Sequence, residues 1–333
     1  MRIVVTGIAG FLGSHLAERL IALGHDVAGC DSLLGGELLN VPPEAEFHQY
    51  DCCDFNAMTR VMKGAELVYH CAATAYEGLS VFAPAMVMDN IVTGSVAVFS
   101  AAIAGGARRI VFCSSMARYG TNRVPFEEGF DPRPQDPYGI AKVAAEAALR
   151  NLAGVHGVEY AIAVPNNIIG ARQKFDDPYR NVASIMANLM LQGRQPFIYG
   201  DGEQQRCFSH VEDCLDCLLA MGLAGRGTGQ VVNIGPDEEF VSINVLFRRL
   251  KDLTGFEGQA IHLTDRPQEV KHAFCSAGRA RQLLGYRTTR TLDEGLQDVV
   301  THIRTLGPRK FRYHLDLEIR TARTPRTWTE RLM

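Results

Sequence analysis

Residues 2–13 read Arg2-Ile3-Val4-Val5-Thr6-Gly7-Ile8-Ala9-Gly10-Phe11-Leu12-Gly13. A short apolar run rich in β-branched residues is typical of a buried parallel strand. The glycines that come next permit a tight turn and a close approach of the backbone to a phosphate group, which then sits at the N-terminus of a helix expected over 12–23. We therefore expect Gly7, Gly10, Phe11, Leu12 and Gly13 to form a phosphate-binding turn.

A second strand, expected over 26–31, ends in Asp31. A carboxylate at about this distance from a glycine-rich turn can accept hydrogen bonds from the 2′-hydroxyl of an adenosine ribose. It would repel a 2′-phosphate, so the sequence favours NAD over NADP. The glycines alone would also fit a plain strand–turn–helix, and Asp31 together with the residues downstream favours the dinucleotide.

Tyr138 and Lys142 stand four residues apart, after Asp136-Pro137. A phenol with a pKa of about 10 is a poor base at neutral pH. An ammonium one helical turn away lies on the same helix face and should lower that pKa. Ser115, expected just past a strand end, could hold a substrate oxygen beside the phenol. These residues predict a proton-transfer site for making or reducing a carbonyl, which requires a hydride carrier.

Strands and helices alternate along the first half of the chain. This pattern predicts an α/β fold, a Rossmann-type doubly wound parallel sheet with helices on both faces. The expected strands are 2–6, 26–31, 47–50, 66–71, 109–114 and 159–164, and the expected helices are 12–23, 56–63, 89–105 and 138–153. Ligands bind such sheets at the carboxyl ends of the strands.

After Gly170 the sequence has Arg- and Lys-rich stretches, isolated prolines and shorter predicted elements over 171–200 and 236–333. We expect residues 1–170 to form the NAD-binding domain, with a returning segment near 207–235. Residues 171–333 would form a smaller, interleaved C-terminal lobe that binds substrate and includes an extension over 307–333. Alternating Phe311, Tyr313, Leu315 and Leu317 predict a strand or an extended arm in that extension.

The composition limits the classes of partner. The 34 basic and 37 acidic residues give a formal charge of −3, and this lack of excess positive charge argues against binding of nucleic acid. The apolar stretches look shorter than a membrane span needs. The nine cysteines, without an apparent secretory signal, predict reduced thiols in a cytoplasmic protein. Cys52-Cys53 and the pair Cys214 and Cys217 lack a second pair at zinc spacing, so we expect no metal.

Further motifs occur in a fixed order. They are Asp51-Cys52, His70-Cys71-Ala72-Ala73, Asn90, Ser114-Ser115-Met116-Ala117-Arg118-Tyr119-Gly120, Tyr138-Gly139-Ile140-Ala141-Lys142, Asn167 before Gly170, Gly200-Asp201-Gly202-Glu203, Arg206, Asn233-Ile234-Gly235 and Arg266-Pro267. Over roughly the first 300 residues the chain resembles the extended short-chain dehydrogenase/reductases of the nucleotide-sugar epimerase/dehydratase group, such as UDP-glucose 4-epimerases.

The resemblance implies roles for single residues. Tyr138 would be the catalytic base, Lys142 would lower its pKa and bind the nicotinamide ribose, and Ser115 would bridge the substrate oxygen and Tyr138. Asp51, Cys52, Ala72, Ala73 and Asn90 would add to the NAD site, although Asn90 could equally be a helix N-cap. His70 is expected to be a core histidine, and Ser114 a strand-end residue bonded to backbone.

The resemblance also implies a nucleotide-sugar substrate. Arg206 and Arg266 would bind its pyrophosphate with guanidinium groups, and Asn167 would contact the same group. Thr74 and Glu77 lie in a loop expected beside the sugar. Related proteins form two-fold dimers through the helices that correspond to 89–105 and 138–153, so we expect a homodimer.

The two residues after Ser115 narrow the choice of reaction. Dehydratases of the group carry an acid pair there and decarboxylases usually a glutamate, whereas Met116-Ala117 cannot transfer a proton. The sequence therefore favours 4-epimerisation of a UDP-hexose, and a small Ala273 would leave room for an N-acetyl group. A dehydratase that uses Glu77, a 4-ketoreductase and a non-enzymatic NAD sensor remain as alternatives. The segment Val164-Pro165-Asn166-Asn167 departs from the group's usual pattern.

Overall fold

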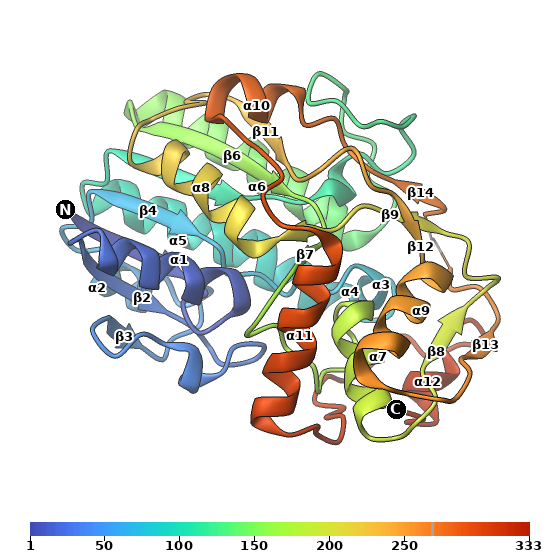
Figure 1. The fold of residues 1–333 in the computed structure, drawn as a ribbon. Helices are drawn as coiled ribbons and strands as arrows, with labels where there is room; N and C mark the ends of the chain where they lie inside the picture. The colour runs from blue at the N-terminus through green and yellow to red at the C-terminus, as the bar shows by residue number, and fades with distance from the viewer. Residues whose placement is uncertain (268–269) are drawn as a thin grey trace.

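A seven-stranded parallel sheet forms the centre of the computed structural model, which describes residues 1–267 and 270–333 (Figure 1). In spatial order the strands are β11 (Val231–Ile234), β6 (Glu159–Pro165), β5 (Arg109–Cys113), β4 (Leu67–His70), β1 (Arg2–Thr6), β2 (Asp26–Cys30) and β3 (Glu46–His48). Strands β1 to β6 lie in the order β3-β2-β1-β4-β5-β6, which is that of a doubly wound dinucleotide-binding sheet. The predicted fold class is confirmed.

Helices cover both faces of this sheet, because alternate strand residues point to opposite sides. Ile3 and Val5 join the core under α1 (Phe11–Ala22), α8 (Val211–Gly222) and α10 (Gly278–Leu284). Val4 joins the core on the other face, under α2 (Phe55–Val61), α5 (Gly94–Ala104) and α6 (Pro137–His156). The segment after residue 206 returns to the sheet, since β11 pairs in parallel with β6.

The helix expected over 89–105 begins earlier. It starts at Pro84 with α4 (Pro84–Met88), passes through a π-helical turn (Asp89–Thr93) and continues as α5. Residues Pro84–Ala104 are long and apolar enough to cross a membrane by length and composition, which the sequence analysis did not expect, but half of this stretch is buried inside the fold. Such burial is typical of a core helix, and here the helix packs on α2 and α6.

The second lobe (residues 171–206 and 236–333) has its own core between α7 (Val182–Leu191), α9 (Ile243–Thr254) and α11 (Leu292–Leu306). Short strands complete it: β8 (Phe197–Tyr199) pairs with β13 (Ile261–Leu263), and β9 (Gln205–Arg206) with β12 (Val241–Ser242) and β14 (His272–Ala273). Where the chain passes between the lobes, β7 (Ile168–Ile169) pairs with β10 (Ser209–His210). The remaining short helices are α3 (Glu77–Ser80), α12 (Arg326–Thr329), and 3-10 turns at Leu38–Asn40 and Met116–Arg118.

The C-terminal extension, residues 307–333, runs as an extended arm across the second lobe and ends beside α7 and α12 (Figure 1). It contains no strand in its described residues, because its backbone bonds are isolated, such as Ile319 N–H to the Phe82 carbonyl at 2.9 Å. Tyr313, Leu315 and Trp328 pack into a small core with residues of 76–83. The arm therefore supports the loop that was expected beside the sugar.

Candidate active site

The catalytic candidates meet where β5 ends and α6 begins. Asp136 caps α6 by accepting a hydrogen bond from the Gly139 N–H at 2.8 Å, and Pro137 occupies the first turn, where it lacks an N–H to satisfy. Tyr138 and Lys142 therefore lie on one face of the first turns. Both side chains are buried, at 7% and 3% exposure.

Tyr138 and Ser115 interact directly. Burial raises the pKa of the Tyr138 phenol, a hydrogen bond with Ser115 acts in the opposite direction, and the carboxylate of Glu77 raises the pKa further. The Ser115 hydroxyl also accepts a hydrogen bond from the Ala117 N–H at 3.1 Å, which fixes its position at the strand end.

Lys142 lies one helical turn after Tyr138, and its predicted effect on the phenol stays a prediction. Its Nζ lies 5.9 Å from the Tyr138 ring centroid and donates to the Cys113 carbonyl at 2.8 Å. Burial lowers the pKa of Lys142 to about 8. Burial is the largest influence on the pKa of the Tyr138 phenol and raises it.

A buried ion network lies directly behind these residues. Glu146 is fully buried on α6 and accepts hydrogen bonds from the Ser114 hydroxyl at 2.5 Å and from the Arg118 Nε at 2.9 Å. Arg150 adds an ion pair at 3.0 Å. Ser114 therefore bonds a carboxylate through its side chain, where the sequence analysis expected backbone. Glu146 was missed, although its position four residues after Lys142 places it on the same helix face.

The glycine-rich turn fits a dinucleotide. A Cβ on Gly13 would lie 2.2 Å from the Gly7 carbonyl oxygen, and a Cβ on Gly7 would lie 2.9 Å from the Ala72 backbone, so the turn closes only with glycines. Helix α1 has no side-chain cap, and its first residues line the cleft. Such a helix N-terminus offers backbone N–H groups to a pyrophosphate.

Asp31 lies at the end of β2, where the sequence placed it. Its carboxylate accepts hydrogen bonds from the Ala9 N–H at 3.2 Å and the Leu33 N–H at 2.8 Å. Burial raises the pKa of this carboxyl. A carboxylate held beside the glycine turn can receive the hydroxyls of an adenosine ribose, and thus fits NAD.

All predicted site residues line a single cleft of about 530 Å³ at the carboxyl ends of the strands. They are Gly7, Gly10, Phe11, Leu12, Gly13, Asp31, Asp51, Cys52, Ala72, Ala73, Thr74, Glu77, Asn90, Ser115, Tyr138, Lys142, Asn167, Arg206 and Arg266. The structure therefore brings these residues together, while their individual roles stay predictions. His70 lies in the core and bonds Thr6 at 2.7 Å and Ser95 at 3.0 Å.

Asn90 is not an N-cap, because it lies inside the helix that begins at Pro84. Its side-chain oxygen accepts a hydrogen bond from the Thr74 N–H at 3.0 Å. The Thr74 hydroxyl is buried and has no hydrogen-bond partner among the described residues. Asn90 therefore shapes the loop after β4, and Thr74 offers a polar group to the cleft.

The second lobe supplies the opposite wall, together with Asn167 from the segment that leads into it. Arg206 lies in β9, and the Arg266 guanidinium stacks on the Tyr199 ring at 4.7 Å. Asn167 adopts a left-handed backbone (φ 35°) and donates to the Cys207 carbonyl at 3.0 Å. Trp328 of the C-terminal arm also lines this wall, a contribution that no sequence motif indicated.

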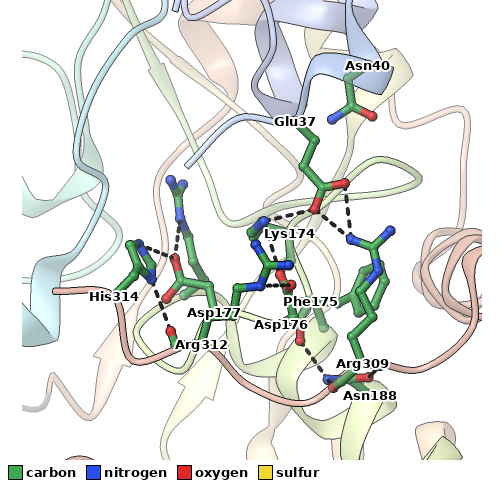
Figure 2. Close-up of polar contacts among 12 residues, drawn as sticks. Glu37, Asn40, Lys174, Phe175, Asp176, Asp177, Asn188, Arg309, Arg312 and His314 are labelled. Atoms are coloured by element: carbon green, nitrogen blue, oxygen red, sulfur yellow. Dashed lines mark hydrogen bonds and ion pairs between the residues drawn. The ribbon is translucent and has the colours of Figure 1, made fainter. Parts of the chain in front are cut away.

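Ion pairs join the lobes beside the cofactor end of the cleft. Figure 2 shows Glu37, from the loop after β2, between Lys174 at 2.8 Å and Arg309 at 2.9 Å. Lys174 also pairs with the buried Asp176 at 3.1 Å. Burial raises the pKa of Glu37, but the two cations outweigh it and hold that pKa below its usual range. The loop after β2 is thus fixed to the second lobe and the arm.

The comparisons with known proteins agree with this geometry. The profile of the NAD dependent epimerase/dehydratase family matches residues 3–235. A putative UDP-glucose 4-epimerase of Methanocaldococcus jannaschii is 35% identical over 303 residues, which is 90% of this chain and 97% of the relative.

Solved structures are similar over the same range. UDP-glucose 4-epimerase of Thermotoga maritima with UDP-glucose superposes with a TM-score of 0.87 at 33% identity, over 92% of this chain and 99% of that one. UDP-glucuronic acid 4-epimerase of Bacillus cereus, in complex with a fluorinated UDP-glucuronic acid and NAD, has a TM-score of 0.83 at 25% identity, over 92% and 100% of the two chains. The match of sequence profile, fold and cofactor cleft shows that this chain belongs to the NAD-dependent epimerase/dehydratase family of the extended short-chain dehydrogenase/reductases.

Proposed function

We propose that this enzyme interconverts two UDP-sugars by inverting carbon 4, on a UDP-hexose or a UDP-N-acetylhexosamine. The observation that carries the proposal is the hydrogen-bonded pair of the buried Tyr138 and the half-buried Ser115, beside which Met116 and Ala117 provide no titratable group. Epimerisation at carbon 4 needs a single proton-transfer residue, whereas elimination needs a second one.

The chain's own residues have distinct parts in this reaction. Tyr138 exchanges the proton of the 4-hydroxyl, Ser115 holds that oxygen, and Lys142 keeps a positive charge below the phenol. NAD, when bound, supplies the acceptor and donor of the hydride at carbon 4. Because Tyr138 and Lys142 are almost completely buried, few water molecules can reach the phenol and the ammonium.

The second lobe accounts for the nucleotide. Arg206 and Arg266 of this lobe line the cleft together with Asn167, which comes from the segment leading into the lobe, and guanidinium groups are suited to a pyrophosphate. Relatives named as UDP-glucose 4-epimerases support uridine as the nucleoside.

Room for an acetamido group is supported by a small side cavity. Ala273 lines a space of about 50 Å³ that shares Glu77, Asn167 and Arg206 with the main cleft. Space of this size holds a few water molecules. We therefore expect UDP-N-acetylglucosamine to be accepted, and Ala273→Tyr to exclude it while UDP-glucose still turns over.

The test is turnover without added cofactor, with UDP-glucose, UDP-N-acetylglucosamine and UDP-glucuronic acid, and products identified by NMR and mass spectrometry. A product of unchanged mass with an inverted carbon 4, absent in Tyr138→Phe, supports the proposal. A product that is lighter by water or carbon dioxide contradicts it.

Glu77 favours a second candidate, elimination or decarboxylation. Its carboxylate lines both cavities and lies close enough to raise the pKa of Tyr138. A product of lower mass, lost in Glu77→Gln, would establish this candidate. Net oxidation of added NADH would instead indicate a 4-ketoreductase, and NAD binding without turnover a sensor.

We also infer a homodimer through α5 and α6. Val96 on α5 and Ile140 on α6 are 36% and 46% exposed, and α5 packs directly on α6. Exposed apolar side chains on adjoining helices favour a self-complementary contact. Sedimentation of wild type and Ile140→Glu tests this, because a dimer through this face should dissociate in the variant.

A further inference from the structure

Arg180 belongs to the second lobe but lies against the cofactor domain. It stands just before α7, whose N-cap is Asn181. Its Nη2 is so near the loop after β2 that a Cβ on Gly35 would lie only 1.9 Å away. The backbone at Gly35 therefore makes room for this guanidinium, and both residues line the cleft.

Two fully buried residues hold Arg180 in place. Its guanidinium stacks on the Tyr76 ring at 4.7 Å, and its Nε lies 3.5 Å from the Asp177 carboxylate. The Tyr76 hydroxyl donates to the same carboxylate at 2.8 Å. The buried Arg180 Nε faces Asp177, whereas Nη2 is the guanidinium nitrogen that reaches the loop at Gly35, so Asp177 positions the cation from the side of its Nε.

The C-terminal arm supports this unit. Trp328 packs on the Tyr179 ring at 5.3 Å and donates to the Pro178 carbonyl at 3.1 Å. The Arg312 N–H donates to the Asp176 carbonyl at 2.8 Å, and His314 approaches Asp177 within 4.0 Å (Figure 2). The segment that carries Arg180 is thus braced by contacts from residues 312–328.

Arg180 lies between the two ends of the cofactor site. Its positive charge lowers the pKa of Asp31 at one end and that of Tyr138 at the other, although burial raises both more strongly. Asp31 marks the adenosine ribose, and Tyr138 marks the reacting carbon beside the nicotinamide. In a dinucleotide that spans these ends, the pyrophosphate lies in the middle, beside the Gly35 loop and the glycine turn.

The glycine turn itself offers this pyrophosphate only backbone N–H groups. Lys174, another cation that lines the cleft, is paired with Glu37 and Asp176. Lys142 lies at the nicotinamide end under Tyr138. A doubly charged group in a half-buried site is stabilised by a guanidinium fork whose donors remain available.

We propose that Arg180 binds the pyrophosphate of NAD, so that the second lobe supplies a cation to the cofactor site. The cofactor then bridges the two lobes, which favours its retention through repeated turnovers. This inference rests on the family's cofactor and not on the proposed 4-epimerisation, so the two can fail separately.

The experiment measures ligand affinity by calorimetry on protein freed from cofactor. Arg180→Ala should weaken NAD and ADP-ribose by about 10- to 100-fold, the loss expected for a charge-assisted hydrogen bond, and should leave UDP affinity unchanged. Arg180→Lys should recover part of the loss. Gly35→Ala keeps the charge but displaces the guanidinium, so it should weaken NAD as well.

Arg266→Ala serves as the matched opposite control, since it should weaken UDP and spare NAD. Adenosine, which lacks phosphate, should bind wild type and Arg180→Ala equally. The proposal is overturned if Arg180→Ala weakens UDP or UDP-glucuronic acid while NAD affinity is unchanged, which would assign Arg180 to the substrate. It is also overturned if a folded Arg180→Ala, judged by its thermal melt, binds all ligands as wild type does.

Discussion

Glu146→Ala should be among the most destabilising single changes near the active site. The substitution removes the carboxylate that bonds Ser114 and Arg118, and Arg118 is 3% exposed. Its Nη1 already lacks a hydrogen-bond partner in the described part of the chain. An orphaned buried charge costs about 3–5 kcal/mol. Arg150 is 37% exposed and can return to water, so it adds little.

The matched control is Glu159→Ala, which breaks the ion pair with Arg109. Those side chains are 51% and 21% exposed, so the expected loss is below about 1 kcal/mol. Urea unfolding of cofactor-free protein measures both, provided that the slopes of the transitions agree. In the double variant Arg118→Met, Glu146→Met both charges are gone, and most of the stability should return.

Equal midpoints for Glu146→Ala and Glu159→Ala would refute the reasoning. So would a double variant as unstable as Glu146→Ala, because the loss would then come from the shape of the site and not from the unpaired charge. Ser115 comes directly after Ser114, so a displaced strand end should also lower kcat more than it changes KM.

Three further predictions concern buried groups. Burial lowers the pKa of His70 to about 3, so as the pH falls the unfolded state binds a proton on His70 before the folded state does. The His70 contribution to stability is therefore full above pH 6.5, and the free energy of unfolding should fall by about 2 kcal/mol from pH 6.5 to 5. His70→Gln should flatten this slope in urea titrations. The lowered pKa of Lys142, about 8, means that the cofactor-free protein gains stability as pH rises from about 8 to 10.5. The burial penalty amounts to about 3 kcal/mol at pH 7, and the lost hydrogen bond to the Cys113 carbonyl offsets about 1 kcal/mol of that gain. Lys142→Met should therefore be about 2 kcal/mol more stable at pH 7 yet inactive, and a less stable variant would contradict this sign. Trp328→Ala should release the arm and raise KM for the UDP-sugar, and faster hydrogen exchange over 76–83 and 307–333 would detect the release. Trp328→Phe should retain most of the packing. Unchanged exchange in Trp328→Ala would contradict the role of the arm.

The parts of the site that lie close together in sequence could be predicted from it. Gly7, Gly10 and Gly13 form their turn through local backbone contacts, and Tyr138 and Lys142 share a helix face because a helix turns every 3.6 residues. Short continuous apolar runs that alternate with helical segments likewise predict the parallel sheet, so Asp31 and Ser115 were placed at the correct strand ends. These features depend on periodicities that single segments carry.

The sequence alone did not indicate contacts between distant segments. Tyr76 and Asp177 are 101 residues apart, and their hydrogen bond, with Arg180 against Gly35, exists only because the two lobes close on each other. The pKa of Tyr138 depends on the whole fold for the same reason: its phenol and the ammonium of Lys142 lie on one helix face as expected, but the burial that raises this pKa comes from many distant segments. Spacing along the chain specifies which groups can meet, whereas desolvation and long-range partners arise only when the tertiary structure is complete.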